Sequence, residues 1–126
     1  MSLDTCDGHG HGHGHGHGNG NASAELQPYR KQLDRINELL VDLLAERMQV
    51  CRLIARVKSA RGIAIMQPLR VNSTLDQVRA LSGPRKLRPE YLDGLFRLII
   101  EETCDEERRV MAVLEASPEG REPCAR

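Results

Sequence analysis

The 126-residue chain has no excess of charge, few aromatic residues and no long apolar run. Its 18 Lys+Arg and 18 Asp+Glu give a formal net charge of +0, so nothing indicates a general preference for nucleic acid or an acidic membrane surface. Aromatic residues make up 2% of the chain, and no apolar run could span a bilayer. Residues 1–6 lack the charged lead and apolar core of a secretory signal, so we expect a cytoplasmic protein.

The folded part also lacks the residues on which most enzymes depend. All five histidines lie between residues 9 and 17, which excludes imidazole acid–base catalysis in the core. The cysteines have no metal-ligand or disulfide-framework spacing, which indicates free thiols. They are Cys6, Cys51, Cys104 and Cys124. Because a phosphate loop, paired hydrolase-like carboxylates and a Cys/His pair are also absent, we expect chemistry based on charge and shape, without cofactor or metal.

Two tails flank the predicted domain. We expect residues 1–22, in which glycine alternates with histidine, to be disordered because they cannot bury anything. The tail histidines could hold Zn or Ni with flexible geometry, or the tail has no role in the main activity. These histidines are His9, His11, His13, His15 and His17. The helical domain is predicted over residues 23–116, followed by a flexible tail over residues 117–126.

The first predicted helix is unusually long. It starts near Ser23, a possible N-cap with Pro28 in about the first turn, and it ends near Arg61 because Gly62 suits a C-cap. At 1.5 Å per residue it measures roughly 50 Å, which is longer than a small domain is wide. No short partner within the chain could cover its apolar stripe, whereas a second copy could. We therefore predict an intertwined homodimer.

Two further helices complete an all-α fold without strands. An apolar loop stopped by Pro68 precedes a short helix over about residues 69–81. A break at residues 82–84 and a basic connection follow. The third helix, of medium length, is predicted from Pro89, which suits a first turn, to about residue 114.

Charged residues occupy the apolar faces of the two longer predicted helices. At 100° per residue the first helix has an apolar stripe of Leu33, Ile36, Leu40, Leu43, Leu44, Val50, Cys51 and Ile54. Arg47 lies near the centre of this stripe, and Lys58 lies further along the same line. Glu107, with Thr103 one turn before it, lies in the apolar face of the third helix. A buried cation is costly unless it meets a carboxylate of the protein or an anionic ligand.

The cations could therefore pair with a carboxylate of the protein or with an anionic ligand. In one interpretation Arg47 or Lys58 pairs with Glu107 and only sets the register of a helical dimerisation module. The charge count favours the other interpretation, because Arg70 near the start of the second helix adds a further cation. Arg30 lies at the edge of the stripe, where it suits a residue that reaches into a neighbouring subunit's pocket. A dry pocket with excess positive charge would attract a small dicarboxylate.

Five short motifs, in this order and spacing, resemble those of the AroQ class of chorismate mutases over about residues 29–111. The motifs are Arg-x-x-Leu-Asp from Arg30, Leu-Leu-Ala-Glu-Arg ending at Arg47, Val-Lys at Lys58, Pro-x-Arg at Arg70, and Phe-Arg-Leu-Ile-Ile-Glu from Phe96. The resemblance implies an intertwined all-α homodimer that rearranges chorismate to prephenate by a [3,3]-sigmatropic (Claisen) reaction. It also implies that Arg47 and Arg30 bind the two substrate carboxylates, with Arg30 contributed by the other subunit.

The same resemblance implies roles for the remaining charged residues. Lys58 and Glu107 flank the ether oxygen of the breaking bond, Arg70 adds positive charge near a carboxylate, and Thr103 lies near the ring carboxylate. Many relatives carry glutamine at the position of Glu107. A glutamate can donate a hydrogen bond only when it is protonated, so we predict an activity that falls as pH rises.

One departure bears on the substrate. Ordinary members have a glutamate directly after the Pro-x-Arg arginine, which accepts from the C4 hydroxyl of chorismate, whereas this chain has Val71. The string from Met66 through Gln67 to Val71, with Cys104, is similar to 4-amino-4-deoxychorismate mutases, which act in antibiotic pathways. We expect Gln67 and Val71 to bind that substrate. The alternatives are a plain chorismate mutase and, within the same fold, an isochorismate pyruvate lyase.

Overall fold

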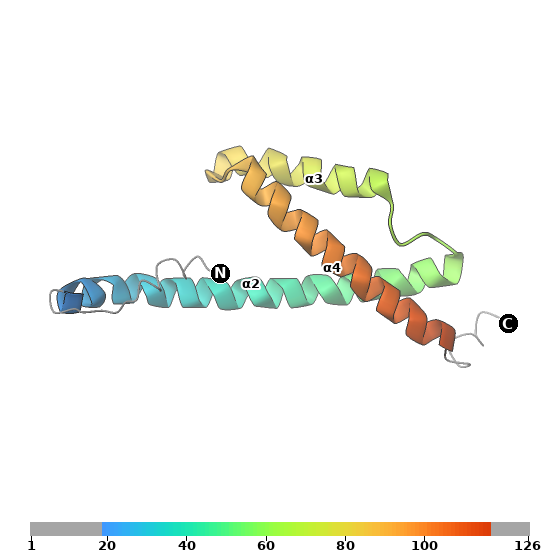
Figure 1. Ribbon diagram of the computed structural model, residues 1–126, viewed down its shortest axis with the longest axis horizontal. Helices are drawn as coiled ribbons and strands as arrows, with labels where there is room; N and C mark the ends of the chain where they lie inside the picture. Colours follow the sequence, from blue (N-terminus) through green and yellow to red (C-terminus); the bar gives the residue numbers. More distant parts are fainter. Residues whose placement is uncertain (1–18, 117–126) are drawn as a thin grey trace. The chain divides into compact units, whose positions relative to one another are not determined.

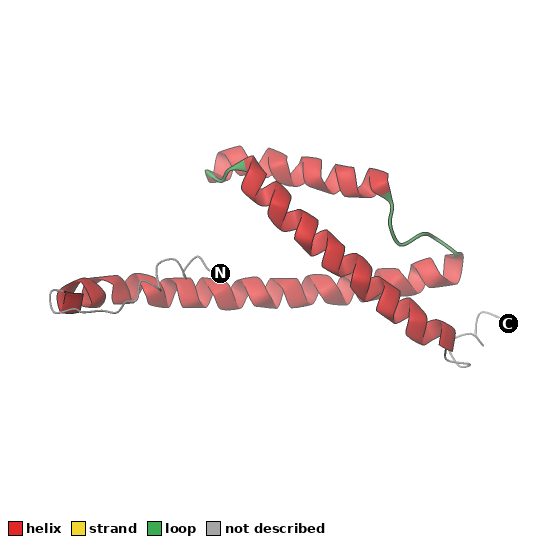
Figure 2. Ribbon diagram, in the orientation of Figure 1, coloured by secondary structure: helices red, strands yellow, loops and turns green. Residues whose placement is uncertain are grey.

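The structure is a computed structural model that describes residues 19–116, and within this range it contains helices and no strand (Figures 1 and 2). The elements are α2 (Asn19–Arg61), α3 (Pro68–Ser82), the short 3₁₀ helix η2 (Gly83–Arg85) and α4 (Pro89–Ala116). The prediction of an all-α fold with one long, one short and one medium helix is confirmed. The Gly/His-rich tail histidines, Cys6 and Cys124 lie outside the described residues.

The chain divides into two compact units, residues 1–45 and residues 46–126, and the division falls within α2. In the first unit, none of the described side chains from residue 22 to residue 45 is buried. The second unit contains the core, which consists of Cys51, Ala55, Leu75, Val78 and Leu92. This core is small, because Leu75 is the one large side chain of the described residues that is less than 2% exposed.

Helix α2 begins earlier than predicted and ends where predicted. It starts at Asn19, so Ser23 lies inside the helix and Pro28 is an interior proline, not a first-turn residue. An interior proline removes one backbone hydrogen bond, and α2 continues through this local loss. At the other end Gly62 adopts φ +65, and the Ile63 N–H donates to the Lys58 carbonyl at 2.9 Å. This left-handed glycine closes the helix, as its position in the sequence indicated.

Prolines set the starts of α3 and α4. Pro68 is at the start of α3, and Gln67 before it is extended at φ −124 and ψ 100, because a residue that precedes proline disfavours the helical region. Pro89 starts α4, with Glu90 in the first turn, where a negative charge is favourable. The structure thus confirms both predicted starts, and each helix extends one or two residues beyond its predicted end.

An ion-pair network ties α3 to α4. The Arg79 guanidinium of α3 donates to the carboxylates of Asp93 on α4 and Asp76 on its own helix. The Arg97 Nε donates to Asp93 Oδ2 at 2.7 Å. The hydrogen bond from Arg97, together with that from Arg79, lowers the pKa of Asp93 below its ordinary value of 3.8. The network fixes how α3 lies along α4, and so it positions the α3 face described below.

Candidate active site

A cavity of about 290 Å³ lies within the second unit, between the C-terminal part of α2, the loop before α3, and helices α3 and α4. Seven of the eight predicted site residues line it: Arg47, Lys58, Gln67, Arg70, Val71, Thr103 and Glu107. The eighth, Arg30, belongs to the first unit and is not among the described residues that line the cavity. One cavity therefore brings together residues from three separate segments of the sequence.

Lys58 forms the central ion pair of the cavity. Its Nζ donates to Glu107 Oε1 at 2.9 Å and to the Ile65 carbonyl at 2.8 Å. The side chains are 13% and 4% exposed, so the pair is largely shielded from water. Of the two pairings considered from the sequence, the structure shows the one with Lys58. An ammonium has three donors, and these two contacts leave one for a ligand.

The two arginines of the cavity are not balanced by carboxylates. Arg47 NH1 donates to the hydroxyl of Thr103 at 3.0 Å and lies 4.0 Å from the sulfur of Cys51. Among the described residues, neither Arg47 nor Arg70 forms an ion pair. The Thr103 hydroxyl in turn donates to the Ile99 carbonyl at 2.8 Å. Because Glu107 already pairs with Lys58, the cavity retains excess positive charge, and a guanidinium is suited to bind a carboxylate.

Sequence reasoning did not assign six further lining residues to the site. They are Cys51, Ile54, Ile65, Thr74, Ile100 and Cys104. Cys51, Ile54 and Ile100 lie on the predicted apolar faces of their helices, so the sequence pattern alone indicates core residues. Thr74 follows Arg70 by four residues on α3, and that helical spacing is the signal that could have found it. The sequence carries no comparable signal for the Ile65 carbonyl.

Adjacent acidic residues on α4 have different surroundings. Glu107 points into the cavity and is 3% exposed. Glu106 instead accepts from Arg52 of α2 at 2.6 Å and from Arg109 at 2.9 Å. These hydrogen bonds, that from Arg52 first, lower the pKa of Glu106. The Arg52–Glu106 pair therefore joins α2 to α4 outside the cavity, next to the residue that pairs with Lys58.

Cys104 is a neutral thiol in the wall of the cavity. Burial raises its pKa, and the nearby Glu107 carboxylate raises it further. Both Cys51 and Cys104 are free cysteines, as expected from their spacing.

Among the described residues no group of three His, Cys, Asp or Glu side chains could hold a metal ion. None of the described helices is long and apolar enough to cross a membrane.

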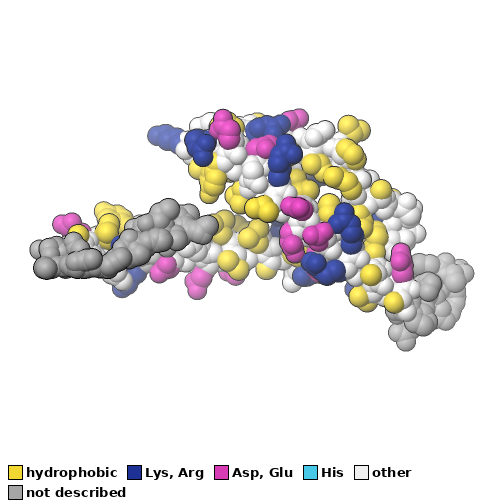
Figure 3. Space-filling view, in the orientation of Figure 1, with side chains coloured by type: hydrophobic (Ala, Val, Ile, Leu, Met, Phe, Trp, Pro, Cys, Tyr) yellow, Lys and Arg dark blue, Asp and Glu magenta, His cyan; other side chains and the backbone are white. Residues whose placement is uncertain are grey.

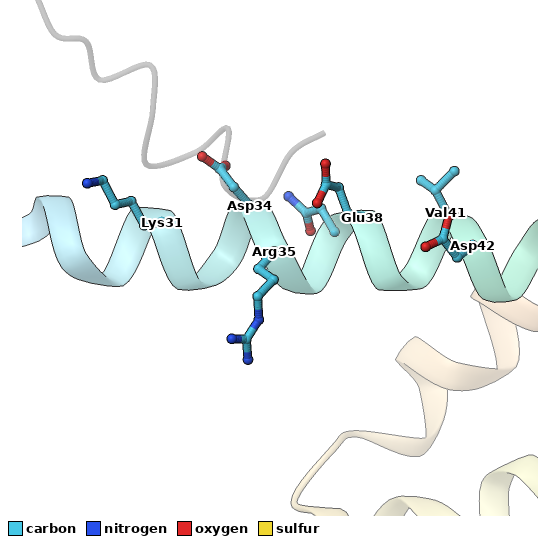
Figure 4. A pocket seen from close by; sticks show the side chains of 7 residues that line it. Lys31, Asp34, Arg35, Glu38, Val41 and Asp42 are labelled. Carbon is cyan, nitrogen blue, oxygen red and sulfur yellow. The ribbon is translucent and has the colours of Figure 1, made fainter.

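A second concave surface, of about 550 Å³, lies in the first unit along residues 31–42 of α2. Figure 4 shows Asp34 and Glu38 pointing to the same side of the helix, whereas Arg35 points to the opposite side. All of its described lining residues come from one exposed helix segment and carry charges of both signs. Such a surface does not have the enclosed, convergent polar groups of a small-molecule site.

Comparisons with known proteins agree with this geometry. Residues 29–108 match the family model of chorismate mutase type II. The chain is 35% identical over 88 residues to a 4-amino-4-deoxychorismate mutase of Streptomyces venezuelae, a match that covers 70% of this chain and 85% of that protein. It is 28% identical over 79 residues to a 4-amino-4-deoxychorismate mutase of Streptomyces pristinaespiralis, covering 63% of this chain and 61% of that protein.

A third relative carries the name of the family. The chain is 29% identical over 77 residues to a chorismate mutase of Methanocaldococcus jannaschii, which covers 61% of this chain and 78% of that protein. The residues matched by the family model include every predicted site residue, from Arg30 to Glu107. The chain therefore belongs to the chorismate mutase type II family and is an isomerase with chorismate mutase activity.

Proposed function

We propose that the enzyme rearranges 4-amino-4-deoxychorismate to 4-amino-4-deoxyprephenate. The observation that carries the proposal is one cavity lined by the Lys58–Glu107 pair and by two arginines without carboxylate partners, Arg47 and Arg70. The substrate is a dicarboxylate whose reaction breaks one C–O bond and forms one C–C bond within the same molecule. It needs no nucleophile and no cofactor, and the cavity is suited to bind and compact such a molecule.

Binding of the carboxylates supplies orientation. Arg47 is held by Thr103 with its guanidinium at the cavity wall, and a guanidinium can bind a carboxylate through two parallel hydrogen bonds. Arg70 adds a second positive charge from the first turn of α3. Fixing both carboxylates selects the compact substrate conformer in which the bond-forming carbons approach each other. The compact conformer, which is rare for the free substrate, thereby becomes the main conformer of the bound substrate.

Lys58 and Glu107 act at the ether oxygen in this proposal. Negative charge grows on that oxygen as the C–O bond breaks, and the third donor of the Lys58 ammonium can stabilise it. The Ile65 carbonyl and Glu107 hold the ammonium in place before the substrate arrives. Glu107 in its protonated form would donate a second hydrogen bond to the same oxygen.

A second copy of the chain would complete the site. The stripe of α2 in the first unit remains exposed, with Leu33 at 37%, Ile36 at 47% and Leu40 at 53% exposed. Hydrophobic side chains also appear at the surface among charged ones in Figure 3. Such a long apolar stripe is stabilised by an equally long partner. We propose an intertwined homodimer in which Arg30 of each protomer binds a substrate carboxylate in the other protomer's cavity.

Val71 lowers the expected affinity for chorismate, whereas the preference for an ammonium rests on the similarity to 4-amino-4-deoxychorismate mutases. This aliphatic residue lines the cavity directly after Arg70, so it offers no acceptor to a C4 hydroxyl. The similarity to two 4-amino-4-deoxychorismate mutases supports the amino substrate. The product would then enter specialised metabolism. Chorismate remains the second candidate, because the relative from Methanocaldococcus jannaschii is named a chorismate mutase.

The test compares kcat/KM of the purified enzyme on 4-amino-4-deoxychorismate, chorismate and isochorismate, assayed separately. We expect the amino compound to give the highest value. The variant Val71→Glu restores an acceptor for the C4 hydroxyl, so it should raise kcat/KM for chorismate. A wild-type preference for chorismate would contradict the proposed substrate, and pyruvate release from isochorismate would identify a lyase.

A further inference from the structure

The face of α3 that lines the cavity differs in chemistry from the other walls. Val71 and Thr74 are three residues apart, so they lie on one side of α3, and Gln67 directly precedes this helix. All three line the cavity, and Val71 and Thr74 are half-buried there. This wall of the cavity therefore presents two uncharged polar side chains and one aliphatic side chain.

The side-chain oxygens on the other walls of the cavity already accept hydrogen bonds. Lys58 pairs with Glu107, and Arg47 binds the hydroxyl of Thr103. Among the described residues that line the cavity, Gln67 and Thr74 are the uncharged side chains with oxygen atoms that form no hydrogen bond to another described residue. Gln67 also does not cap α3 with its side chain. Their oxygens are therefore available to a ligand.

If the proposed function holds, each polar group of the substrate can be assigned to one part of the cavity, and the last assignment follows by elimination. Its two carboxylates suit the arginines, and its ether oxygen suits Lys58 and Glu107. The substituent at ring carbon C4 is the remaining polar group, and the α3 face is the remaining wall. We propose that Thr74 is a specificity-determining residue whose hydroxyl oxygen accepts a hydrogen bond from the C4 substituent.

Hydrogen-bonding capacity explains why this contact favours an amine. An ammonium has three donors and no acceptor, whereas a hydroxyl has one donor and two acceptor lone pairs. Thr74 and Gln67 can both accept from the ammonium, while a hydroxyl can donate to only one of them. A hydrogen bond to a charged group is also stronger than one between neutral groups. Loss of the Thr74 hydroxyl should therefore weaken the amino substrate more than chorismate.

The test is Thr74→Val, which removes the hydroxyl and keeps the shape of the side chain. We expect kcat/KM for 4-amino-4-deoxychorismate to fall about 10- to 100-fold and that for chorismate to fall about threefold or less. Thr74→Ser, which retains the hydroxyl, should restore the wild-type ratio. Ser73→Ala is the matched control, because the neighbouring Ser73 is exposed and does not line the cavity.

The readout is the ratio of the two kcat/KM values relative to wild type. An equal loss on both substrates, or no change in the ratio, would overturn the assignment of Thr74. This outcome is distinct from failure of the proposed function, which is measured on the wild-type enzyme alone. If wild type prefers chorismate but Thr74→Val still lowers the ratio, Thr74 contacts the C4 substituent and the proposed substrate is wrong. If wild type prefers the amino compound and the ratio stays fixed, the proposed substrate stands and Thr74 is not its determinant.

Discussion

The two halves of α2 carry the same kind of apolar stripe but have different partners. In the second unit Cys51 and Ala55 are buried, and Arg47 and Lys58 contact side chains of α4. In the first unit the stripe continues, yet none of the described side chains from residue 22 to residue 45 is buried. The same pattern thus yields a core where the chain supplies partners and an open surface where it does not.

This difference separates the apolar surface that the described part of one chain buries from the apolar surface that it leaves exposed. One chain assembles a cavity, a shielded Lys58–Glu107 pair and two arginines suited to anions. It does not cover the first-unit stripe, from Leu33 to Leu44, that lies beyond Arg30 in the sequence. If a second copy covers that stripe, changes in either half should reduce activity, but by different routes.

The largest effect is expected from a charge in the exposed stripe. Leu40→Glu should prevent dimer formation, because the interface would have to bury an unpaired carboxylate. We expect a loss of more than about 100-fold in specific activity and a monomer by sedimentation or light scattering. Glu38→Gln, on the opposite side of the helix from the stripe, is the control and should remain an active dimer. A fully active monomeric Leu40→Glu would refute the homodimer proposal.

The next effect concerns the cavity itself. Lys58→Ala removes the proposed donor to the ether oxygen and should lower kcat about 10²- to 10³-fold while the protein remains dimeric. It also leaves Glu107 buried without its partner, so thermal unfolding must be measured alongside activity. Arg56→Ala, two residues earlier on an exposed position of α2, is the matched control. A loss of less than tenfold in kcat would argue for a register role alone.

A smaller effect is expected from pH. Glu107 accepts from Lys58 at 2.9 Å, whereas the proposed hydrogen bond from Glu107 to the ether oxygen requires a protonated carboxyl group. The wild-type kcat should therefore fall as pH rises, since fewer molecules carry the proton. Glu107→Gln donates at every pH and should flatten the profile. A flat wild-type profile through neutrality would contradict the donor role of Glu107.

The smallest effect concerns stability and involves Asp93, which does not line the cavity. The pKa of Asp93 is lowered in the folded protein, so its contribution to stability is present above its ordinary value of 3.8. That contribution is lost as pH falls through the lower folded value. Asp93→Asn should thus be less stable than wild type at pH 7, and the urea unfolding curves should converge as the pH falls below 3.8. A difference that is constant with pH would mean that ionisation of Asp93 does not stabilise the α3–α4 contact.

Glycine and proline residues at helix ends made most of the helix boundaries predictable from the sequence. Gly62, Pro68 and Pro89 mark helix boundaries because glycine accepts positive φ and proline lacks a backbone donor. The start of α2 was not predictable in the same way. Ser23 and Pro28 resemble a first turn, but a long helix tolerates both in its interior, and only the structure shows that it starts at Asn19.

The site was predictable where a charge interrupts an apolar face. Arg47, Lys58 and Glu107 stand out by that criterion, and all three line the cavity. The choice of Lys58 over Arg47 as the partner of Glu107 depends on distances between helices, which sequence periodicity does not contain. Thr74 was missed although it follows Arg70 by about one helical turn, a signal that the sequence analysis did not use.

The most direct test of the central claim mixes two inactive variants. Arg30→Ala and Lys58→Ala, unfolded and refolded together at equal concentration, should form mixed dimers. If Arg30 acts in the partner's cavity, one of the two sites in each mixed dimer contains both residues intact. Random pairing then restores activity at about one quarter of all sites. Activity no higher than the sum of the separate variants would contradict a site shared between two copies of the chain.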